Sequence, residues 1–173
     1  MKKIALAVLL SAVAVPAFAE GMYAGVIVGQ TKYDFAGAGI TGAAKDSATA
    51  VGILGGYSIN ENFAAELAYN NLGNVEIAPG MSVKGSAMSL CAVGSYAISN
   101  EFSLFAKLGA AQTKVEPTGQ ASETWSGATF GIGGQYAVTP GIGIRVGYDK
   151  FKVGATDPRI DTGVTSIGGI FKF

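Results

Sequence analysis

Very few side chains in this chain of 173 residues can take part in covalent or metal chemistry. The sequence has no histidine and a single cysteine, Cys91. Without histidine, imidazole acid–base catalysis, serine–histidine triads and histidine metal ligands are all excluded. One cysteine can form neither an internal disulfide nor a thiolate metal cluster, and we interpret it as a small buried side chain. We therefore predict no catalytic residue, no metal site and no cofactor.

Four charged residues stand out because they interrupt otherwise apolar or small-residue stretches: Glu66, Lys107, Arg145 and Asp149. If these charges are removed from water they must pair with one another, since an isolated buried charge costs several kcal/mol. Two interpretations follow. The four residues are either a structural network that fixes the register of the chain, which we favour, or a plug that interrupts ion flow and opens by exchanging partners.

The composition excludes several classes of protein. Charged residues make up 14% of the chain, against about 25% in ordinary soluble domains. The longest apolar stretch after the N-terminal region, residues 48–57, is much shorter than the roughly 20 residues of a transmembrane helix. The net charge of zero provides no basic surface for nucleic acid. The chain is therefore neither a typical soluble domain nor a helical membrane protein.

The N-terminal residues have the three regions of a secretory signal peptide. Lys2 and Lys3 precede an apolar run over 4–15, and the sequence Ala17-Phe18-Ala19 supplies small residues at a cleavage site. The alternative is a membrane anchor, but the apolar run is too short to span a bilayer. We predict that residues 1–19 are removed after Ala19 and that residues 20–173 form one domain.

A repeat of about 40 residues organises this domain. Tyr57, Tyr96 and Tyr136 each precede a short polar turn and a new apolar run. Each of the four repeats holds two stretches in which apolar residues alternate with small or polar ones. This pattern predicts eight strands: 22–32, 47–58, 63–72, 84–97, 102–114, 124–137, 142–151 and 163–173. Short turns lie at one end, and four long loops lie at the other: 33–46, 73–83, 115–123 and 152–162. This asymmetry is typical of an eight-stranded antiparallel up-and-down transmembrane β-barrel of the outer membrane.

Period-2 alternation places apolar residues on one face of each strand and small residues with rare charges on the other. A secreted soluble barrel of the lipocalin type would show the same stripes with the polar face in water. The polar face carries only about five charges, which is too few for a soluble surface and suits a narrow barrel lumen. The apolar face is therefore predicted to meet lipid.

Aromatic residues recur at the predicted turns and at the C-terminus, at the height where an interfacial girdle is expected. The predicted periplasmic girdle consists of Tyr57, Phe63, Tyr96, Phe102, Tyr136 and Phe173. Trp125, near the other end of its strand, faces inward by parity unless a bulge turns it outward.

These features resemble the transmembrane domain of the outer membrane protein A (OmpA) family and its small single-domain relatives. The resemblance is carried by residues 22–29, 56–69, 107–109, 134–148 and the ending 168–173. It implies that Phe171 and Phe173 form the C-terminal signal read by the barrel-assembly machinery. It also implies that Glu66, Lys107 and Arg145 match the charged lumen cluster of the family. At the positions where the family has its other lumen charges, this chain has the uncharged residues Ile27, Val93 and Gln135. We therefore expect a less charged interior.

The resemblance makes an outer-membrane barrel with a structural or surface-interaction role, and at most a narrow solute path, the favoured function. Its expected partners are outer-membrane lipid, lipopolysaccharide and an extracellular partner that contacts the four loops. The family's larger members carry a periplasmic peptidoglycan-binding domain, and none is expected after Phe173. The alternative is a small-barrel enzyme acting on lipid A, which the absence of histidine disfavours because the known deacylase pairs Ser with His.

Overall fold

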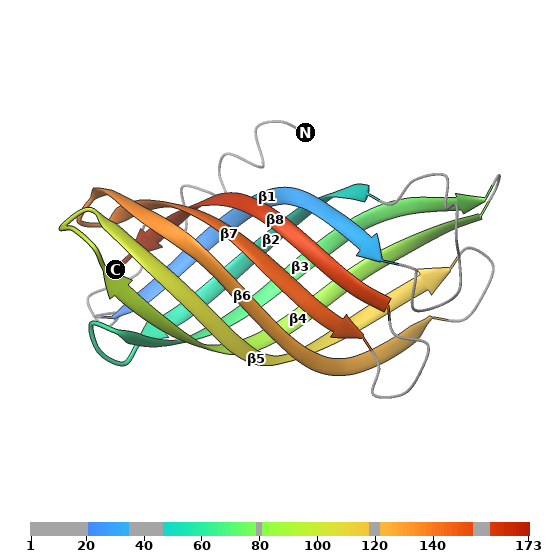
Figure 1. Ribbon diagram of the computed structural model, residues 1–173, viewed down its shortest axis with the longest axis horizontal. Helices are drawn as coiled ribbons and strands as arrows, with labels where there is room; N and C mark the ends of the chain where they lie inside the picture. Colours follow the sequence, from blue (N-terminus) through green and yellow to red (C-terminus); the bar gives the residue numbers. More distant parts are fainter. Residues whose placement is uncertain (1–20, 35–46, 79–80, 118–121, 154–159) are drawn as a thin grey trace.

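Eight long strands account for nearly all of the described chain (Figure 1). The computed structural model describes residues 21–34, 47–78, 81–117, 122–153 and 160–173. The predicted signal peptide lies outside these ranges. The strands are β1 (Met22–Asp34), β2 (Ser47–Ser58), β3 (Phe63–Ala78), β4 (Met81–Ala97), β5 (Phe102–Pro117), β6 (Glu123–Thr139), β7 (Ile142–Val153) and β8 (Ile160–Lys172).

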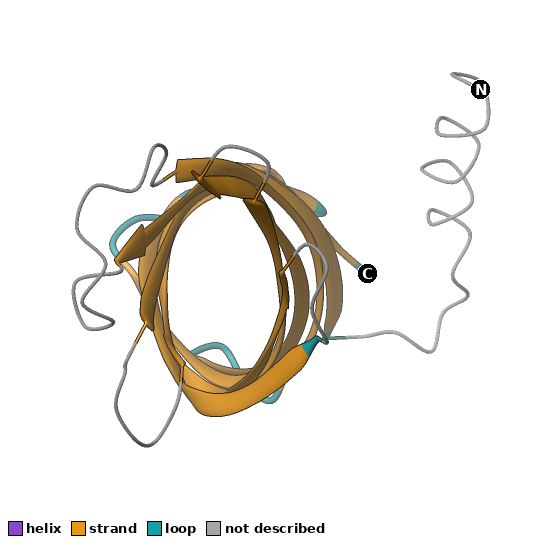
Figure 2. Ribbon diagram, turned by 90° about the vertical axis from the view of Figure 1, so that its right-hand side faces the viewer, coloured by secondary structure: helices purple, strands orange, loops and turns teal. Residues whose placement is uncertain are grey.

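The strands close into a barrel. Each strand pairs antiparallel with the next one in sequence, and β8 returns to pair antiparallel with β1, so the end-on view is a complete ring of strands (Figure 2). Closure removes the free edges that a sheet would otherwise expose to lipid. The predicted fold class is confirmed. Within the described residues, no helix is long and apolar enough to cross a membrane.

Side-chain exposure shows which face of each strand points outward. Large apolar residues on the predicted lipid face are exposed, with Leu108 at 66% and Ile53 at 61%, whereas Glu66 and Ile170 on the other face are each 1% exposed. A soluble lipid-binding barrel has the reverse arrangement, because its apolar side chains line the interior. The outer wall is therefore suited to hydrocarbon.

The two ends of the barrel differ. Three short turns, at 59–62, 98–101 and 140–141, define what we call the turn end. Two of them are closed by backbone hydrogen bonds in which Ile59 N–H donates to the carbonyl of Phe63 at 2.8 Å and Ile98 N–H donates to Phe102 at 2.9 Å. The opposite end, where β1 leads to β2, β3 to β4, β5 to β6 and β7 to β8, is the connection end.

The prediction of a loop over 73–83 is wrong, because β3 and β4 continue through most of it as a paired ladder that includes Val75 opposite Val83. A β-bulge between Asn71 and Gly73 explains the error. Gly73 has a φ of +83°, and its N–H donates to Asn71 Oδ1 at 3.0 Å. The extra residue moves the inward position from the even residue Leu72 to the odd residue Val75, both fully buried, so the sequence loses its alternation there.

The other three predicted loops are also shorter than expected. Strand structure covers 33–34 in the first, 115–117 and 123 in the third, and 152–153 and 160–162 in the fourth. The hydrogen-bond ladder continues beyond the apolar wall, where both faces of the strands carry polar residues. Hydropathy alternation therefore ends before the backbone pairing does.

Candidate functional site: the charged cluster of the lumen

Three strands bring the four predicted lumen charges to one level of the barrel. Glu66 lies on β3, Lys107 on β5, and Arg145 and Asp149 on β7. The register places Lys107 opposite Gly131 on β6, and Gly131 opposite Asp149. A Cβ at Gly131 would stand only 2.1 Å from Asp149 Oδ1. The missing side chain on β6 therefore allows Lys107 and Asp149 to meet across it.

The four side chains form a continuous chain of ion pairs. Arg145 Nη1 lies 2.5 Å from Glu66 Oε2, Lys107 Nζ lies 3.3 Å from Glu66 Oε1, and Lys107 Nζ lies 3.0 Å from Asp149 Oδ1. Both Glu66 and Lys107 are shared between two partners of opposite charge. With two acids and two bases, the cluster carries no net formal charge, which is the arrangement that makes buried charges tolerable.

Neutral side chains complete the cluster, and sequence reasoning did not assign them to it. The Tyr23 hydroxyl donates to Glu66 Oε2 at 3.0 Å. Gln135 Oε1 accepts from Arg145 Nε at 3.2 Å and from Nη2 at 3.1 Å. The guanidinium also lies 4.7 Å from the ring centre of Phe105, within the range of a cation–π contact. Each arginine nitrogen therefore has at least one polar partner.

The cross-strand register contains the signal that would have identified these residues. Gln135 pairs directly with Arg145, and Tyr23 pairs with Gly56, which in turn pairs with Glu66. Residues that face each other across neighbouring strands share one face of the sheet. Gln135 is therefore an uncharged hydrogen-bonding partner for the arginine on the neighbouring strand.

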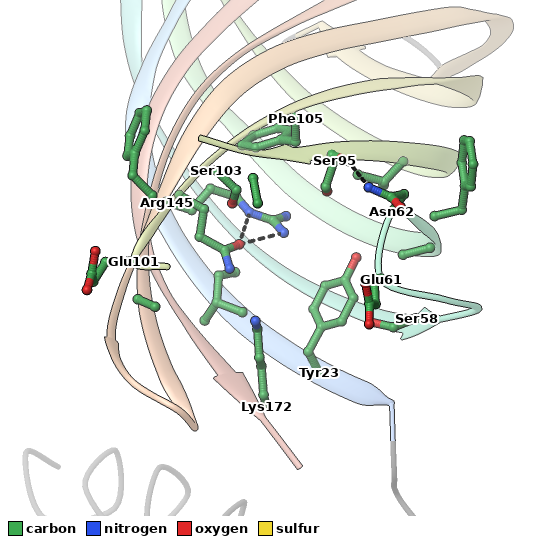
Figure 3. A pocket seen from close by; sticks show the side chains of 18 of the residues that line it. Tyr23, Ser58, Glu61, Asn62, Ser95, Glu101, Ser103, Phe105, Arg145 and Lys172 are labelled. Atoms are coloured by element: carbon green, nitrogen blue, oxygen red, sulfur yellow. Dashed lines mark hydrogen bonds between the residues drawn. The ribbon is translucent and has the colours of Figure 1, made fainter. Parts of the chain in front are cut away.

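A polar vestibule opens from the cluster toward the turn end (Figure 3). Arg145, Gln135 and Phe105 line it on the side of the cluster. Serine, asparagine and charged residues of the turns and the adjoining strand ends line it at the turn end: Ser58, Asn60, Glu61, Asn62, Ser95, Ser99, Asn100, Glu101 and Lys172. Tyr23, which donates to Glu66, also lines this space.

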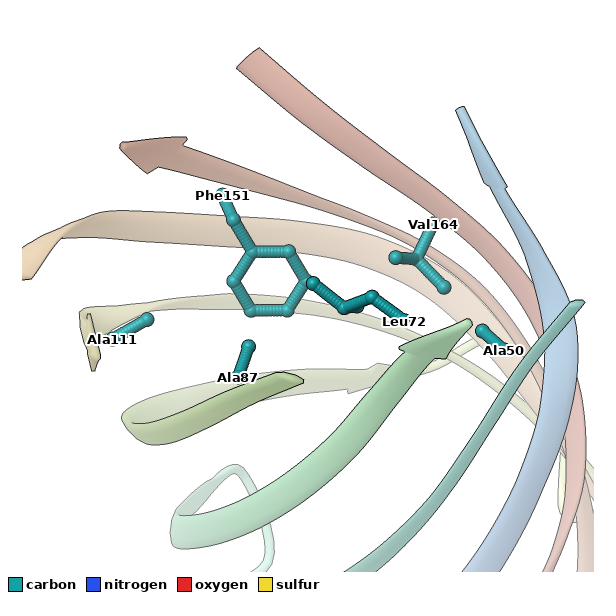
Figure 4. Close-up of a cluster of buried hydrophobic side chains, with 6 residues drawn as sticks. All are labelled: Ala50, Leu72, Ala87, Ala111, Phe151 and Val164. Atoms are coloured by element: carbon teal, nitrogen blue, oxygen red, sulfur yellow. The ribbon is translucent and has the colours of Figure 1, made fainter. Parts of the chain in front are cut away.

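An apolar cluster lies in the lumen on the other side of the charges (Figure 4). Leu72 and Phe151 are the next inward residues after Asn70 and Asp149, and both are almost completely buried. They pack with Ala50, Ala87, Ala111 and Val164. Tyr33 lies against this group and its hydroxyl donates to the carbonyl of Leu72 at 3.1 Å. The lumen thus has a charged layer and an apolar layer in series.

The arrangement provides few means of chemical reaction. Both carboxylates of the cluster are held by cations, and Cys91, though inward-facing, is buried. No group of three His, Cys, Asp or Glu side chains in the described part of the chain is placed to hold a metal. What the cluster can do is exchange partners, because Glu66 and Lys107 each contact two groups of opposite charge.

The predicted girdle residues lie on the outer wall at the turn end. All six are exposed, from 38% for Phe102 to 71% for Tyr96. The register pairs Phe102 directly with Tyr136. Phe171 is half-buried, and the backbone N–H of Phe173 donates to the carbonyl of Met22 at 3.0 Å. The C-terminus is therefore fixed beside the start of β1.

Trp125 lies on the same face of the sheet as the lumen residues. It pairs with Thr113, which is buried inside the barrel, and no register shift separates β5 from β6. Its side chain is 39% exposed. Trp125, near the connection end, is therefore at an inward position, as the alternation along its strand predicts.

Comparison with known proteins identifies the family. A family model described as "Outer membrane protein beta-barrel domain" matches residues 5–173. The chain is 27% identical over 197 aligned positions to outer membrane protein A of Escherichia coli O157:H7, covering 100% of this chain and 55% of that protein. It is 28% identical over 201 positions to outer membrane protein A of Salmonella typhi, covering 100% and 56%. The chain therefore spans about half the length of the curated relatives it matches.

Solved structures with low sequence identity share the fold. Neisserial surface protein A (NspA) superimposes with a TM-score of 0.72 at 20% identity, covering 89% of this chain and 98% of that one. The N-terminal β-barrel domain of Pseudomonas aeruginosa OprF gives 0.65 at 18% identity, covering 89% and 98%. Ail, the attachment invasion locus protein of Yersinia pestis, gives 0.63 at 18% identity, covering 89% and 99%. With its closed eight-stranded barrel, apolar outer wall and matching family model, the chain belongs to the outer membrane protein beta-barrel domain family.

Proposed function

We propose that this integral outer-membrane barrel has a structural or surface-interaction role, without catalysis and with a lumen that is closed at rest. The observation that carries the proposal is the filling of the lumen by two successive layers. An ion crossing the barrel would have to displace the ion pairs of Glu66 and Arg145 and then pass between Leu72 and Phe151. Apolar constrictions oppose ion passage because they exclude water.

The surface role is supported by the way the barrel is built and by its structural neighbours. Three tight turns occupy one end, and the four connections that join the strand pairs occupy the other. One neighbour, Ail, is an attachment invasion locus protein, and one of its structures contains a heparin analogue. We place the connection end of this chain outside the cell, where it meets an extracellular partner, and the turn end in the periplasm.

The remaining parts of the proposal concern biogenesis. Export uses residues 1–19 as a signal peptide cleaved after Ala19. The assembly machinery binds the C-terminal strand through Phe171 and Phe173, and the finished barrel is surrounded by phospholipid and lipopolysaccharide. The outward position of Phe173 and its place beside β1 are consistent with a strand that is recognised before the barrel closes.

Electrical recording tests the closed lumen. The purified, refolded protein in a planar bilayer should show no sustained conductance, and a Glu66→Ala variant should also remain silent because the apolar layer is intact. Stable single-channel currents from the unmodified protein would contradict a closed lumen. Carbonate extraction into a soluble fraction would contradict membrane integration itself.

Cysteine labelling in whole cells tests the orientation. In a Cys91→Ser background, Ser99→Cys places a thiol in a turn-end loop, and Glu123→Cys places one at the connection end. A membrane-impermeant maleimide should label Glu123→Cys in intact cells and Ser99→Cys only after the outer membrane is permeabilised. The reverse labelling pattern would show that the barrel is inserted the other way.

A further inference from the structure

A polar groove is set into the outer wall near the connection end, across β3, β4 and β5. Its volume is about 480 Å³, within the range of roughly 300–1,000 Å³ that is usual for ligand pockets. We call it the Gly73 groove and define it by its polar lining residues: Asn71, Asn74, Lys84, Ser86, Lys114 and Glu116. It lies outside the lumen, because Asn71 and Asn74 are exposed whereas Leu72 and Val75 are buried inside the barrel.

The β-bulge of β3 forms the floor of this groove. Along the ladder with β4, Asn71 lies opposite Ser86, Gly73 opposite Gly85, and Asn74 opposite Lys84. The two glycines also line the groove and have no side chain to fill it. The extra residue of the bulge moves Asn74 to the outward face that Asn71 already occupies. The bulge therefore leaves a depression in the wall and places an amide side chain on either side of it.

The groove adjoins the apolar part of the outer wall. Tyr69, which lines the groove, pairs with Met88, and the preceding outward row pairs Leu67 with Leu90. All four side chains are exposed. The Tyr69 ring thus lies at the boundary between the apolar wall and the polar groove. In the proposed orientation, this boundary is where hydrocarbon changes to head groups in the outer leaflet.

The charges in and beside the groove balance. Lys114 Nζ lies 2.6 Å from Glu116 Oε1, and the register places Lys84 opposite Glu116. Counting Glu76, two residues beyond Asn74 on β3, the region has two lysines and two glutamates. The groove therefore has no excess charge that would select an anion or a cation.

We infer that the Gly73 groove binds an uncharged sugar of a glycolipid in the outer leaflet. Each sugar hydroxyl both donates and accepts hydrogen bonds, and the groove offers both kinds of group. Asn71 Oδ1 already accepts from Gly73 N–H at 3.0 Å, so its amide nitrogen donates to the ligand. Lys114 and Glu116 provide a donor next to an acceptor.

The apolar boundary of the groove accounts for the rest of such a ligand. The Tyr69 ring offers an apolar surface to the C–H face of the sugar. The acyl chains lie along the exposed side chains of Leu67 and Leu90. A glycolipid satisfies both surfaces at once, whereas a free sugar contacts only the groove. The inference rests on the orientation proposed above.

Lipid binding measured by native mass spectrometry tests the groove, with the folded protein in a polyoxyethylene detergent that has no sugar head group. The probes are diglucosyl diacylglycerol and phosphatidylcholine with the same acyl chains. The unmodified protein should bind the glycolipid more tightly. The N74A/S86A double variant should bind it roughly 20-fold more weakly, since two hydrogen bonds are lost. Tyr69→Leu, which keeps an apolar side chain at the boundary, should lose about five-fold.

The matched control is the Q30A/T165A double variant. Gln30 and Thr165 are an exposed pair on β1 and β8, so this variant also removes one amide and one hydroxyl from the outer wall without changing its charge. It should keep the affinity of the unmodified protein. Heat-modifiable migration on a denaturing gel checks that each variant is folded.

Four results would count against the inference or its premise. An equal loss in Q30A/T165A would overturn the groove in favour of a general effect of the polar belt. Equal or tighter binding of phosphatidylcholine by the unmodified protein would overturn the sugar. Displacement of the glycolipid by millimolar maltose would overturn the lipid-linked source in favour of a soluble saccharide. Inverted cysteine labelling would refute the orientation without changing these affinities.

Discussion

Glu66 is the most connected charged residue of the lumen. It accepts from Tyr23 and forms ion pairs with both Arg145 and Lys107, while only 1% of its surface is exposed. Arg145 has no other carboxylate partner within the cluster, whereas Lys107 keeps Asp149. Loss of Glu66 therefore leaves one buried cation without an anion.

We expect Glu66→Ala to lower the free energy of unfolding by about 3–5 kcal/mol. The remaining partner would stay buried without an opposite charge to offset its loss of hydration. Urea titration of the folded barrel, followed by its heat-modifiable migration on a denaturing gel, measures the change. Glu116→Ala removes a carboxylate from an exposed ion pair on the outer wall and should leave the midpoint unchanged. Equal urea midpoints of unfolding for Glu66→Ala and Glu116→Ala would refute a stabilising role for the ion pairs of the lumen.

Adjacent glycines on β2 test how tightly the lumen is filled. A Cβ at the inward-facing Gly56 would lie 2.1 Å from Tyr23 Cζ, whereas the nearest atom to a Cβ at the outward-facing Gly55 is 4.0 Å away. Gly56→Ala should displace the tyrosine ring, break its hydrogen bond to Glu66 and destabilise the barrel by about 1–3 kcal/mol. Gly55→Ala should be tolerated in the same urea titration, and a comparable loss there would show that lumen space is not the cause.

Among the elements, the hairpin of β3 and β4 differs most from its sequence-based prediction. The bulge at Gly73 shifts the inward face by one residue and allows both Leu72 and Val75 to be buried. The strands consequently extend past the apolar wall. A segment that has the composition of a loop is therefore part of the paired ladder between β3 and β4.

Hydrogen exchange measures this extension directly. The backbone amides of residues 74–76 and 82–84 that point into the β3–β4 ladder should exchange slowly, at rates typical of paired strands, because these two segments pair residue by residue. Exchange as fast as that of an unstructured peptide would support the loop predicted from the sequence.

The same bulge makes Gly73 difficult to replace. Its positive φ is unfavourable for other residues, and a Cβ there would lie 2.6 Å from both Ala48 Cβ and the Thr49 carbonyl oxygen. Gly73→Ala should destabilise the barrel by about 1–3 kcal/mol and accelerate exchange at 74–76. Gly94→Ala on β4, whose added Cβ would make only an ordinary contact of 3.8 Å with Phe63, is the control and should change neither measurement.

At the scale of the whole molecule, the order of the two layers decides how the lumen behaves. Ion pairs alone can exchange partners, whereas Leu72, Phe151 and Val164 carry no polar side-chain atom. Two buried threonines lie at the same level, because Thr31 pairs with Val164 and Thr162 pairs with Phe151. The charged cluster and the apolar layer should therefore act in series.

Combining substitutions tests this arrangement in planar bilayers. Glu66→Ala alone and the pair Leu72→Ala with Phe151→Ala alone should each remain silent, because one layer is still intact. The triple variant should conduct. Currents from Glu66→Ala alone would mean that the apolar layer is not a barrier, and silence of a correctly folded triple variant would place the barrier elsewhere.

The class of barrel, the number of strands and the outward face of each strand are all predictable from the sequence. These follow from local regularities: period-2 alternation at Phe63–Tyr69 or Ile142–Tyr148, and repeated tyrosines before short turns. Such patterns survive in sequence because each residue on a strand faces either hydrocarbon or lumen. The four lumen charges were recognisable for the same reason, as polar residues on a mostly small-residue face.

Which inward residues contact one another cannot be predicted from the alternation and is set by the folded barrel. Contacts across strands depend on register, and register depends on closure between β1 and β8 and on the bulge at Gly73. That is why Tyr23 and Gln135 were not assigned to the cluster, and why residues 73–83 were predicted as a loop. Alternation specifies a side of the sheet, but the partner on that side is set by strand pairing between residues far apart in the chain.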